Sequence, residues 1–385
     1  MLNGKLLAKK NYKGIVMNKI SLSILSLLLI SACATGHQNN KIAKNAILFI
    51  GDGYGPSVLN ATRVQFYGKD ASMHIDKFPY TARAKTYSIG SIVTDSAAAG
   101  TAMSSGVKTL NGVIAKDNKF KSIESILETA SKAGKKVGIV TSTHIFHATP
   151  AAFFAHSESR RNNHDMGRDI ISTPVDIILG GGQTVLAPYK KALQKNAMVI
   201  EKLADYKGCP EKRIVGVFSK AHLPYLYDRT EEEKKTNLIN MTEKAIECLS
   251  SAKNGFVLMV EGGRIDHALH QRKIVHALYE AKEFDDTIGN TIKQLKKLNL
   301  EHNTIILSTA DHDTGGLSLN SPATDEIGLM KRKNGKWQIK KVQHYSGKGP
   351  HYPVLKLNTD HLSGKKNATD STHTGVDVDL FGKGP

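Results

Sequence analysis

The chain has 385 residues, of which 53 are Lys or Arg and 35 are Asp or Glu, so its formal net charge is +18. With 40% hydrophobic and 23% charged residues, the composition is that of a globular protein and excludes disordered, collagen-like and disulfide-dense classes. The length suits one large α/β domain or two ordinary ones. The basic residues are scattered and form no nucleic-acid-binding motif, so the charge does not predict recognition of nucleic acid.

Residues 1–32 have the layout of a targeting segment. Lysines precede an apolar run, Ile20–Ala32, which is too short to span a bilayer, and this order is typical of a signal peptide. The run ends in a sequence that resembles the bacterial lipobox, so we expect an exported, periplasmic lipoprotein held to the membrane only through a lipid on Cys33. An ordinary secretory signal is the alternative. Met17 is a more natural start than Met1, and removal of residues 1–32 leaves a net charge of +13.

After a linker at residues 33–44, apolar β-like runs alternate with helical segments through a predicted domain at 45–385. The helical spacing is clearest from Ile274 to Leu298, where apolar residues recur every three or four positions. This alternation predicts a three-layer α/β/α sandwich with a mainly parallel central sheet. Residues 317–370 interrupt it and are interpreted as an insertion. The expected strands are 46–50, 137–141, 175–179, 255–260 and 304–308.

Polar residues follow several of the apolar runs, where the carboxyl ends of parallel strands would form a ligand site. We expect five segments to bring side chains to this edge, including the run 92–94, which precedes Asp95 and Ser96. Unpaired carboxylates gathered there would repel one another, so we expect bound cations to neutralise their charge. The candidates are Asp52, Ser96, His147, Thr149, Glu261, Asp311 and His312.

Aspartate and histidine without cysteine point to a catalytic rather than a structural metal. Asp266 and His270 lie four residues apart and would share one helical face, and His373 offers a further imidazole. Each pair alone is more often a surface pair or a helix cap. The glycine-rich run Gly51–Gly55 suggests a dinucleotide loop only superficially, because Pro56 occupies the region of the third glycine. A Ser at a helix start is either a simple capping feature or a phosphate site.

Taken in order, six motifs resemble the alkaline phosphatase family. The resemblance covers roughly residues 45–382 and rests on the segments 48–55 (LFIGDGYG), 93–102 (VTDSAAAGTA), 147–160, 260–270 (VEGGRIDHALH), 309–313 (TADHD) and 372–375 (THTG). It implies an alkaline phosphatase fold and hydrolysis of small-molecule phosphate monoesters to an alcohol and inorganic phosphate through a phosphoserine intermediate.

The resemblance also implies roles for individual residues. Ser96 matches the nucleophile and Arg160 the arginine that holds two phosphate oxygens. The family binds two Zn²⁺ and one Mg²⁺. The first zinc is matched by Asp266, His270 and His373; the second by Asp52, Asp311 and His312; and the magnesium by Asp52, Thr149 and Glu261, with His147 beside it.

This sequence departs from the enterobacterial pattern at three points. His147 and His267 replace an Asp and a Lys, as in the animal enzymes, which leaves the third metal open between magnesium and zinc. The insertion is short for the family's crown, and the sequence stops at Pro385, where relatives continue into a C-terminal helix, so a homodimer is left open. Phosphodiester hydrolysis on the same metal scaffold and a non-catalytic phosphate-binding lipoprotein are the competing functions. Pairing of Cys209 with Cys248 is also left open.

Overall fold

The structure is a computed structural model that describes residues 42–68, 70–319, 331–333, 336–338, 355–357 and 371–385. The predicted targeting segment and residues 33–41 of the predicted linker lie outside the described residues. No helix in the described part of the chain combines the length and apolarity needed to cross a membrane.

Among the described residues, nine strands form one central sheet in the order β2-β15-β8-β1-β7-β3-β4-β6-β5. From β8 to β5 all neighbours are parallel, whereas β15 runs antiparallel to both β8 and β2. The strands are β1 (Asn45–Gly51), β2 (Tyr80–Ala84), β3 (Lys136–His144), β4 (Ile177–Gly181), β5 (Ala197–Ile200), β6 (Arg213–Val217), β7 (Phe256–Gly262), β8 (Thr304–Ala310) and β15 (Val378–Lys383).

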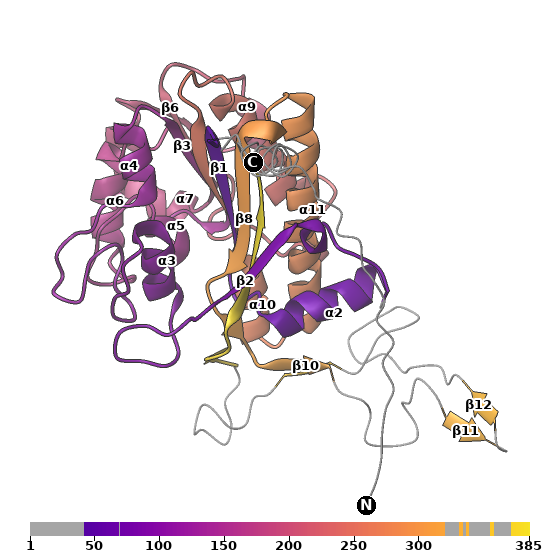
Figure 1. The fold of residues 1–385 in the computed structure, drawn as a ribbon. Helices are drawn as coiled ribbons and strands as arrows, with labels where there is room; N and C mark the ends of the chain where they lie inside the picture. Colours follow the sequence, from indigo (N-terminus) through magenta and orange to yellow (C-terminus); the bar gives the residue numbers. More distant parts are fainter. Residues whose placement is uncertain (1–41, 69, 320–330, 334–335, 339–354, 358–370) are drawn as a thin grey trace, which may run out of the picture. The chain divides into compact units, whose positions relative to one another are not determined.

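Helices cover the sheet on two sides, which gives the three layers (Figure 1). One layer contains α2 (Pro56–Phe66), α9 (Leu238–Leu249), α10 (Arg264–His270) and α11 (Ile274–Lys297). The other contains α3 (Ser96–Ser105), α4 (Ile126–Lys132), α5 (Ala148–Ala151), α6 (Asn163–Ser172), α7 (Gln183–Leu186) and α8 (Lys190–Leu193).

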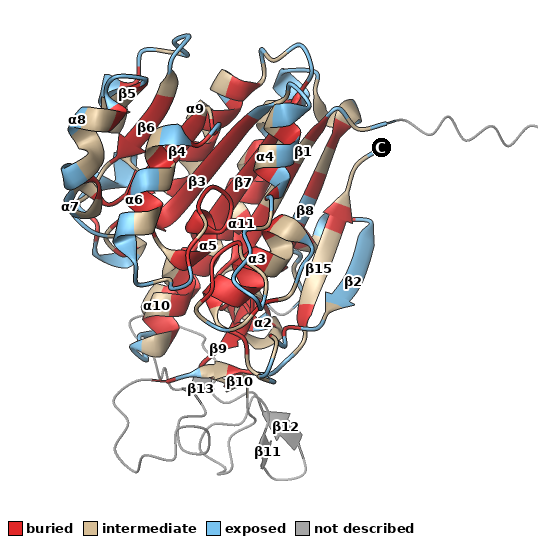
Figure 2. Ribbon diagram, turned by 90° about the vertical axis from the view of Figure 1, so that its left-hand side faces the viewer, coloured by how far each residue is buried: buried red, intermediate tan, exposed pale blue. Residues whose placement is uncertain are grey.

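Strand β7 shows why the sheet needs cover on both faces. All seven of its residues are buried, as the colouring of Figure 2 shows for the middle of the sheet. Phe256, Leu258 and Val260 pack into the core beneath α9 and α11, whereas Val257 and Met259 pack into the opposite core. A continuous apolar strand buried in this way is the signature of a parallel sheet between two helical layers. The predicted fold class is therefore confirmed.

Most of the expected elements form with shifts of one or two residues at their ends. The predicted helix at 274–298 is α11, which buries Leu278, Phe284 and Ile288. The run 92–94 is an exception, because it forms no strand and Ile92 is 83% exposed. Ser96 therefore reaches the site at the start of a helix, the placement that the sequence analysis considered for it, and does not follow a strand.

Most of the predicted insertion at 317–370 lies outside the described residues. The described part contains β10 (Leu317–Leu319), which pairs with β13 (Leu355–Leu357), and β11 (Lys331–Lys333), which pairs with β12 (Lys336–Gln338). Two-residue strands flank this region on both sides: β9 (Asp313–Thr314) pairs with β14 (His373–Thr374).

Cys209 and Cys248 form a disulfide, with their Cα atoms 5.1 Å apart. Cys209 lies between β5 and β6, and Cys248 lies in the last turn of α9. The bond closes a loop of 39 residues and ties the end of the sheet to the helix that covers it. The pairing that the sequence left open is thus formed.

Candidate active site

The candidate residues lie where parallel strands end. Strands β8, β1, β7 and β3 are neighbours in the sheet, so their carboxyl ends share one edge. Asp52 follows β1, Glu261 lies near the end of β7, and Asp311 follows β8 directly. All three carboxylates are buried, and the loop after β3 adds His147. The sheet therefore gathers acidic groups at one edge without exposing them to water.

Ser96 is the first residue of α3, and the residue before it caps the helix. The Asp95 carboxylate accepts a hydrogen bond from the backbone N–H of Ala98. Ser96 is 1% exposed, and its Oγ lies 3.3 Å from Nε2 of His312. A hydroxyl at the N-terminus of a ten-residue helix lies close to unpaired backbone N–H groups, which attract anions.

Asp266, His270 and His373 converge with short separations, although they come from α10 and from β14 more than 100 residues later. His270 Nε2 and His373 Nε2 lie 3.3 Å and 3.6 Å from Asp266 Oδ1 and 3.0 Å from each other. The predicted spacing of Asp266 and His270 on one helical face is confirmed. Only the return of the chain through β14 brings His373 to them.

Backbone carbonyls fix the orientation of these two rings. Nδ1–H of His270 donates to the carbonyl of Ser371 at 2.6 Å, and Nδ1–H of His373 donates to that of Thr94 at 2.9 Å. In the neutral rings both Nε2 atoms therefore carry lone pairs and face the Asp266 carboxylate. Donation from the second ring nitrogen is how metal-binding histidines are commonly held. Three electron-pair donors this close together fit a bound cation, and two imidazoles with a carboxylate suit zinc.

The second group contains Asp52, Asp311 and His312. His312 Nε2 lies 3.2 Å from Asp311 Oδ2 and 3.6 Å from Asp52 Oδ1. Both carboxylate oxygens of Asp52 and Oδ2 of Asp311 are buried without a hydrogen-bond partner. Burial, together with the neighbouring carboxylates, raises the pKa of Asp52 well above its ordinary value and that of Asp311 to about 8. Buried carboxylate oxygens without donors fit a second cation, which would supply the missing positive charge.

The third group adds Glu261 and His147 to Asp52, and its ligand atoms lie within 4.8 Å of one another. Burial raises the pKa of Glu261 to about 7, although hydrogen bonds such as that donated by the Thr141 hydroxyl lower it. Thr149 is buried in the short helix α5, which begins one residue after His147. This group is richest in oxygen atoms, and oxygen ligands suit magnesium.

Arg160 lies next to both the nucleophile's helix and the third group. Its Nη1 donates to Asp95 Oδ2 at 3.0 Å, and its Nη2 donates to His147 Nε2 at 3.3 Å. The carboxylate that caps the helix of Ser96 thus also holds the guanidinium. A fixed, planar donor group of this kind is suited to binding phosphate oxygens.

The glycine-rich run at 51–55 serves close packing rather than a dinucleotide. Gly53 has φ +69°, and an added Cβ would lie 3.0 Å from the Asp266 backbone. At Gly55 an added Cβ would overlap the Asp313 carboxylate. The glycines therefore let the loop that carries Asp52 approach the segments that carry Asp266 and Asp313.

Several supporting residues were missed by the sequence reasoning. Thr314 Oγ1 donates to Asp266 Oδ1 at 2.6 Å and lies 3.2 Å from His312 Nδ1, so it contacts both the first and the second ligand group. Arg264 donates to His267, and His222 packs against His267 with ring centroids 4.4 Å apart. Asp95 and Thr314 could have been found from the sequence, because Asp95 adjoins Ser96 and Thr314 directly follows the TADHD motif. His222 lies in a loop outside the six motifs, so no sequence pattern pointed to it.

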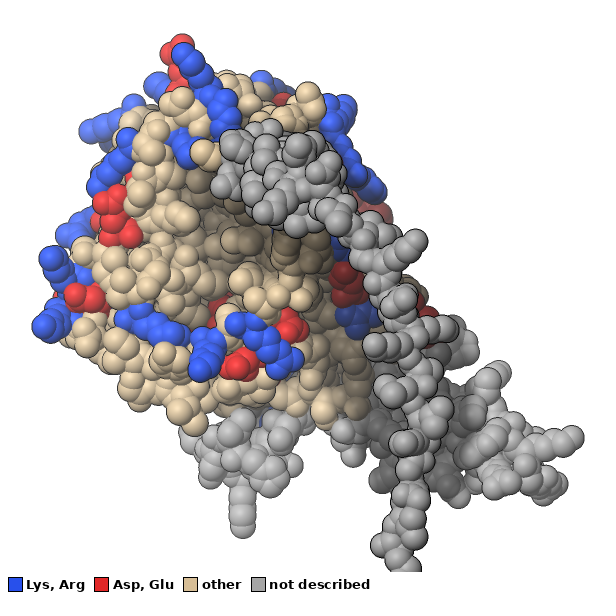
Figure 3. All heavy atoms as spheres, in the orientation of Figure 1, with Lys and Arg blue, Asp and Glu red and all other residues tan. Residues whose placement is uncertain are grey.

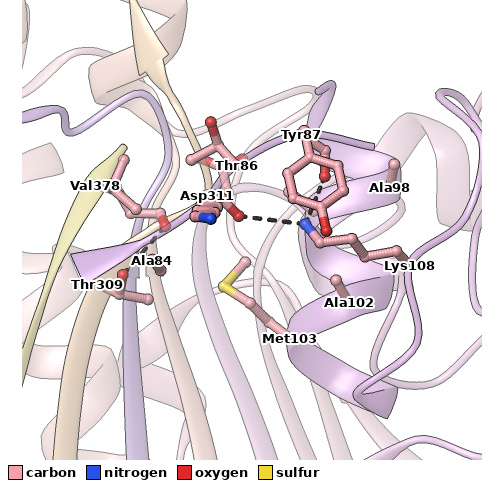
Figure 4. A pocket seen from close by; sticks show the side chains of 13 residues that line it. Ala84, Thr86, Tyr87, Ala98, Ala102, Met103, Lys108, Thr309, Asp311 and Val378 are labelled. Atoms are coloured by element: carbon pink, nitrogen blue, oxygen red, sulfur yellow. Dashed lines mark hydrogen bonds between the residues drawn. The ribbon is translucent and has the colours of Figure 1, made fainter. Parts of the chain in front are cut away.

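A small cavity of about 80 Å³ lies behind α3, on the side of Ala98 and Ala102. Asp311 lies at one side of it, and Lys108 reaches in from the other side (Figure 4). Lys108 Nζ donates to the carbonyls of Lys85 and Tyr87 and lies 4.0 Å from the centre of the Tyr87 ring. The lysine's donors are thus used within the protein, and the cavity adjoins the second ligand group only through Asp311.

The surface charge agrees with a small-molecule site. On the face drawn in Figure 3, lysines and arginines are spread around the periphery and interspersed with acidic residues, with a wide uncharged area between them. The exposed ion pairs, such as Lys190 with Glu201, fit the interpretation of these lysines as solvated surface residues.

The fold and the site define a hydrolase of phosphate esters whose ligand groups could hold metal ions. The family model for alkaline phosphatase matches residues 43–207 and 194–385. The chain belongs to the alkaline phosphatase family, and its relatives in that family are phosphomonoesterases.

Alkaline phosphatase 4 of Bacillus subtilis is 32% identical to this chain, over 90% of this chain and 85% of the relative. Alkaline phosphatase from the Antarctic bacterium TAB5 is 26% identical, with a TM-score of 0.72 and coverage of 90% of this chain and 92% of that one. A TAB5 variant in which one histidine is replaced by glutamate, described with Mg bound in the M3 site, is 27% identical, with a TM-score of 0.71 and the same coverage.

Proposed function

We propose that this chain releases inorganic phosphate from phosphate monoesters with Ser96 as the nucleophile, two zinc ions and one magnesium ion. The observation that carries the proposal is the convergence of His270 Nε2, His373 Nε2 and Asp266 Oδ1 within 3.6 Å of one another, with both rings held through Nδ1. Without a cation these lone pairs would repel one another.

The residues would hold the ions in the three groups described above. Asp266, His270 and His373 would bind the first zinc. Asp52, Asp311 and His312 would bind the second zinc. Asp52, Thr149 and Glu261 would bind the magnesium. When bound, the ions would supply positive charge that activates the serine hydroxyl and neutralises the phosphoryl oxygens. The TAB5 variant with Mg in its M3 site supports magnesium in a site of this family.

The chain's own residues would carry out a double displacement. Ser96 Oγ would attack phosphorus in line as the bond to the alcohol oxygen breaks, which forms a phosphoserine and releases the alcohol. Water would then cleave the P–Oγ bond and regenerate the serine. Arg160, held by Asp95, would bind two phosphate oxygens through both steps. Because recognition is confined to the phosphate, we expect broad tolerance of the alcohol.

The test is hydrolysis of p-nitrophenyl phosphate at alkaline pH by the purified mature chain. The assay is run before chelation, after chelation, and after zinc and magnesium are restored, with bis-p-nitrophenyl phosphate as the matched diester. We expect monoester hydrolysis that chelation abolishes and the two metals restore. Faster release from the diester would identify a phosphodiesterase, and no release from either ester under any metal condition would indicate a binding protein.

We also propose that the chain is exported and anchored in the periplasm through a lipid on Cys33. The support is the order of lysines, apolar run and cysteine at residues 9–33. Labelled palmitate should enter the wild-type chain and not a Cys33→Ser variant; equal labelling of both would refute the anchor. Sedimentation velocity of the mature chain would decide between a monomer and the homodimer that the sequence leaves open.

A further inference from the structure

Four histidines gather beside the third ligand group, and only His147 belongs to that group. His267 lies 4.9 Å from His147 and 4.4 Å from His222, measured between ring centroids, and His144 stacks on His222 at 4.6 Å. They come from α10, the turn before α5, the loop after β6 and the end of β3. Such packing leaves each ring few choices for the position of its proton.

Arg264 fixes the proton of His267. Its Nη1 lies 2.7 Å from Nδ1 of His267, and a guanidinium can only donate. Nδ1 of His267 therefore accepts, and the neutral ring carries its proton on Nε2. Arg264 is held in place by the Tyr225 ring, 3.8 Å from its Cζ, and by a bond from its backbone N–H to Ser142 Oγ.

His267 in turn fixes the proton of His147. Nε2 of His267 lies 3.3 Å from Nε2 of His147, and Arg160 Nη2 also donates to this His147 nitrogen at 3.3 Å. With two donors directed at it, Nε2 of His147 accepts, and the ring carries its proton on Nδ1. Nδ1 of His147 is buried without a partner and lies 3.9 Å from Asp52 Oδ2 and 4.0 Å from Glu261 Oε1.

We propose that Arg264 is a positioning residue for the third metal, because through His267 it holds His147 with a proton, rather than a lone pair, facing that site. The inference rests on the proposed function. A donor N–H favours a hydrated ion bound by oxygen atoms, as Mg²⁺ is, because the N–H can bond a coordinated water or carboxylate. Zn²⁺ would instead take the imidazole lone pair. Arg264 thus selects magnesium over zinc at a site that contains a histidine.

The first experiment locates the protons themselves. Long-range ¹H–¹⁵N spectra are recorded on the chain labelled at histidine and loaded with two equivalents of zinc, with His147→Gln and His267→Gln used for assignment. We expect the Nδ1–H form for His147 and the Nε2–H form for His267. A proton on Nε2 of His147 would overturn the proposal. This measurement needs no turnover, so its result is independent of whether the chain hydrolyses monoesters.

The second experiment removes the donor. Arg264→Met keeps an unbranched chain over Tyr225 but donates nothing, whereas Arg264→Lys keeps a donor for His267. In Lys273→Gln, the matched control, a second cation 5.3 Å from the same Tyr225 ring is removed. After equilibration with both metals, we expect the magnesium-to-zinc preference at the third site to fall about 10- to 100-fold in Arg264→Met.

The variants are compared by their magnesium and zinc content. Arg264→Lys should restore much of the magnesium preference, and Lys273→Gln should match the wild type. At least two bound zinc ions and an unchanged melting temperature would show that Arg264→Met is folded. An unchanged magnesium-to-zinc ratio in that folded variant would overturn the proposal. If Arg264→Met does not fold, the proposal is tested by the proton positions of His147 and His267 in the wild-type chain.

Discussion

His270 and His373 face each other through their Nε2 atoms at 3.0 Å, while the Nδ1 atom of each donates to a backbone carbonyl. Two lone pairs directed at the same point are an arrangement that a bound cation would stabilise. The arrangement joins a helix to a two-residue strand near the end of the chain, so the metal would also stabilise the fold.

Replacement of His270 by alanine should remove the first zinc and leave the second. We expect bound zinc to fall from two ions to about one per chain and monoester hydrolysis to fall by at least 100-fold, because one ligand of three is lost. Metal content by mass spectrometry and the rate with p-nitrophenyl phosphate measure this. His302→Ala, an exposed histidine outside the site, is the control and should keep both values.

The variants Ser96→Ala and Asp311→Ala should distinguish the role of a nucleophile from that of a metal ligand when phosphoserine formation and zinc content are both measured. The serine variant should form no phosphoserine yet keep its zinc, because the hydroxyl is not needed to hold the two ligand groups. The aspartate variant should lose zinc as well as rate, because one buried carboxylate of the second group is gone. Near-full turnover in Ser96→Ala, or unchanged zinc in Asp311→Ala, would contradict the assignments.

Glu280 on α11 lies outside the three ligand groups, and we expect it to make the free energy of unfolding depend on pH. It is buried, and Oε1 accepts from the backbone N–H of Leu226 at 2.7 Å; burial, reinforced by Glu283, raises its pKa to about 7. A carboxyl whose pKa is raised on folding stabilises the fold fully below its unfolded pKa, about 4.3, and this stabilisation is lost as pH rises through about 7.

Glu280→Gln removes that titration while keeping an acceptor for Leu226. We expect the free energy of unfolding of the variant to exceed that of the wild type at pH 8 by about 1–3 kcal/mol, with a smaller or reversed difference at pH 4. Urea unfolding at the two pH values measures it. Glu247→Gln, an exposed residue on α9, is the control; an equal gain there would show that the effect is only one of net charge.

Gly55→Ala should destabilise the loop that carries Asp52. The added Cβ would overlap the Asp313 carboxylate, whose Oδ2 accepts from Thr374 Oγ1. We expect a loss of about 1–3 kcal/mol in the free energy of unfolding, as for other overpacked sites, together with a lower rate. Gly382→Ala is the control, because its Cβ would meet ordinary contacts of 3.4 Å and 3.7 Å.

The Cys209–Cys248 disulfide should add stability by restricting the unfolded chain. For a loop of 39 residues, Cys248→Ser should lower the free energy of unfolding by about 2–4 kcal/mol. Reductant should lower the melting temperature of the wild type toward that of the variant and leave the variant unchanged. Wild-type stability that is insensitive to reductant would show that the bond contributes little.

The sequence by itself determined the mainly parallel sheet between two helical layers and identified most of the candidate ligands. Apolar runs such as 255–260 specify buried strands because they lack the alternation of a half-exposed strand, and Asp266 and His270 share a helical face because of their spacing. The six motifs in order then gave the family, which no single pair of residues could do.

Only the tertiary structure decided which ligands meet and what holds them. His373 joins Asp266 through pairing of β14 with β9, and Arg264, His267 and His147 align only when α10 packs beside the end of β3. The Cys209–Cys248 bond likewise depends on how β6 and α9 are placed. Such contacts join residues far apart in the chain, and their geometry follows from packing, which periodicity and spacing do not encode.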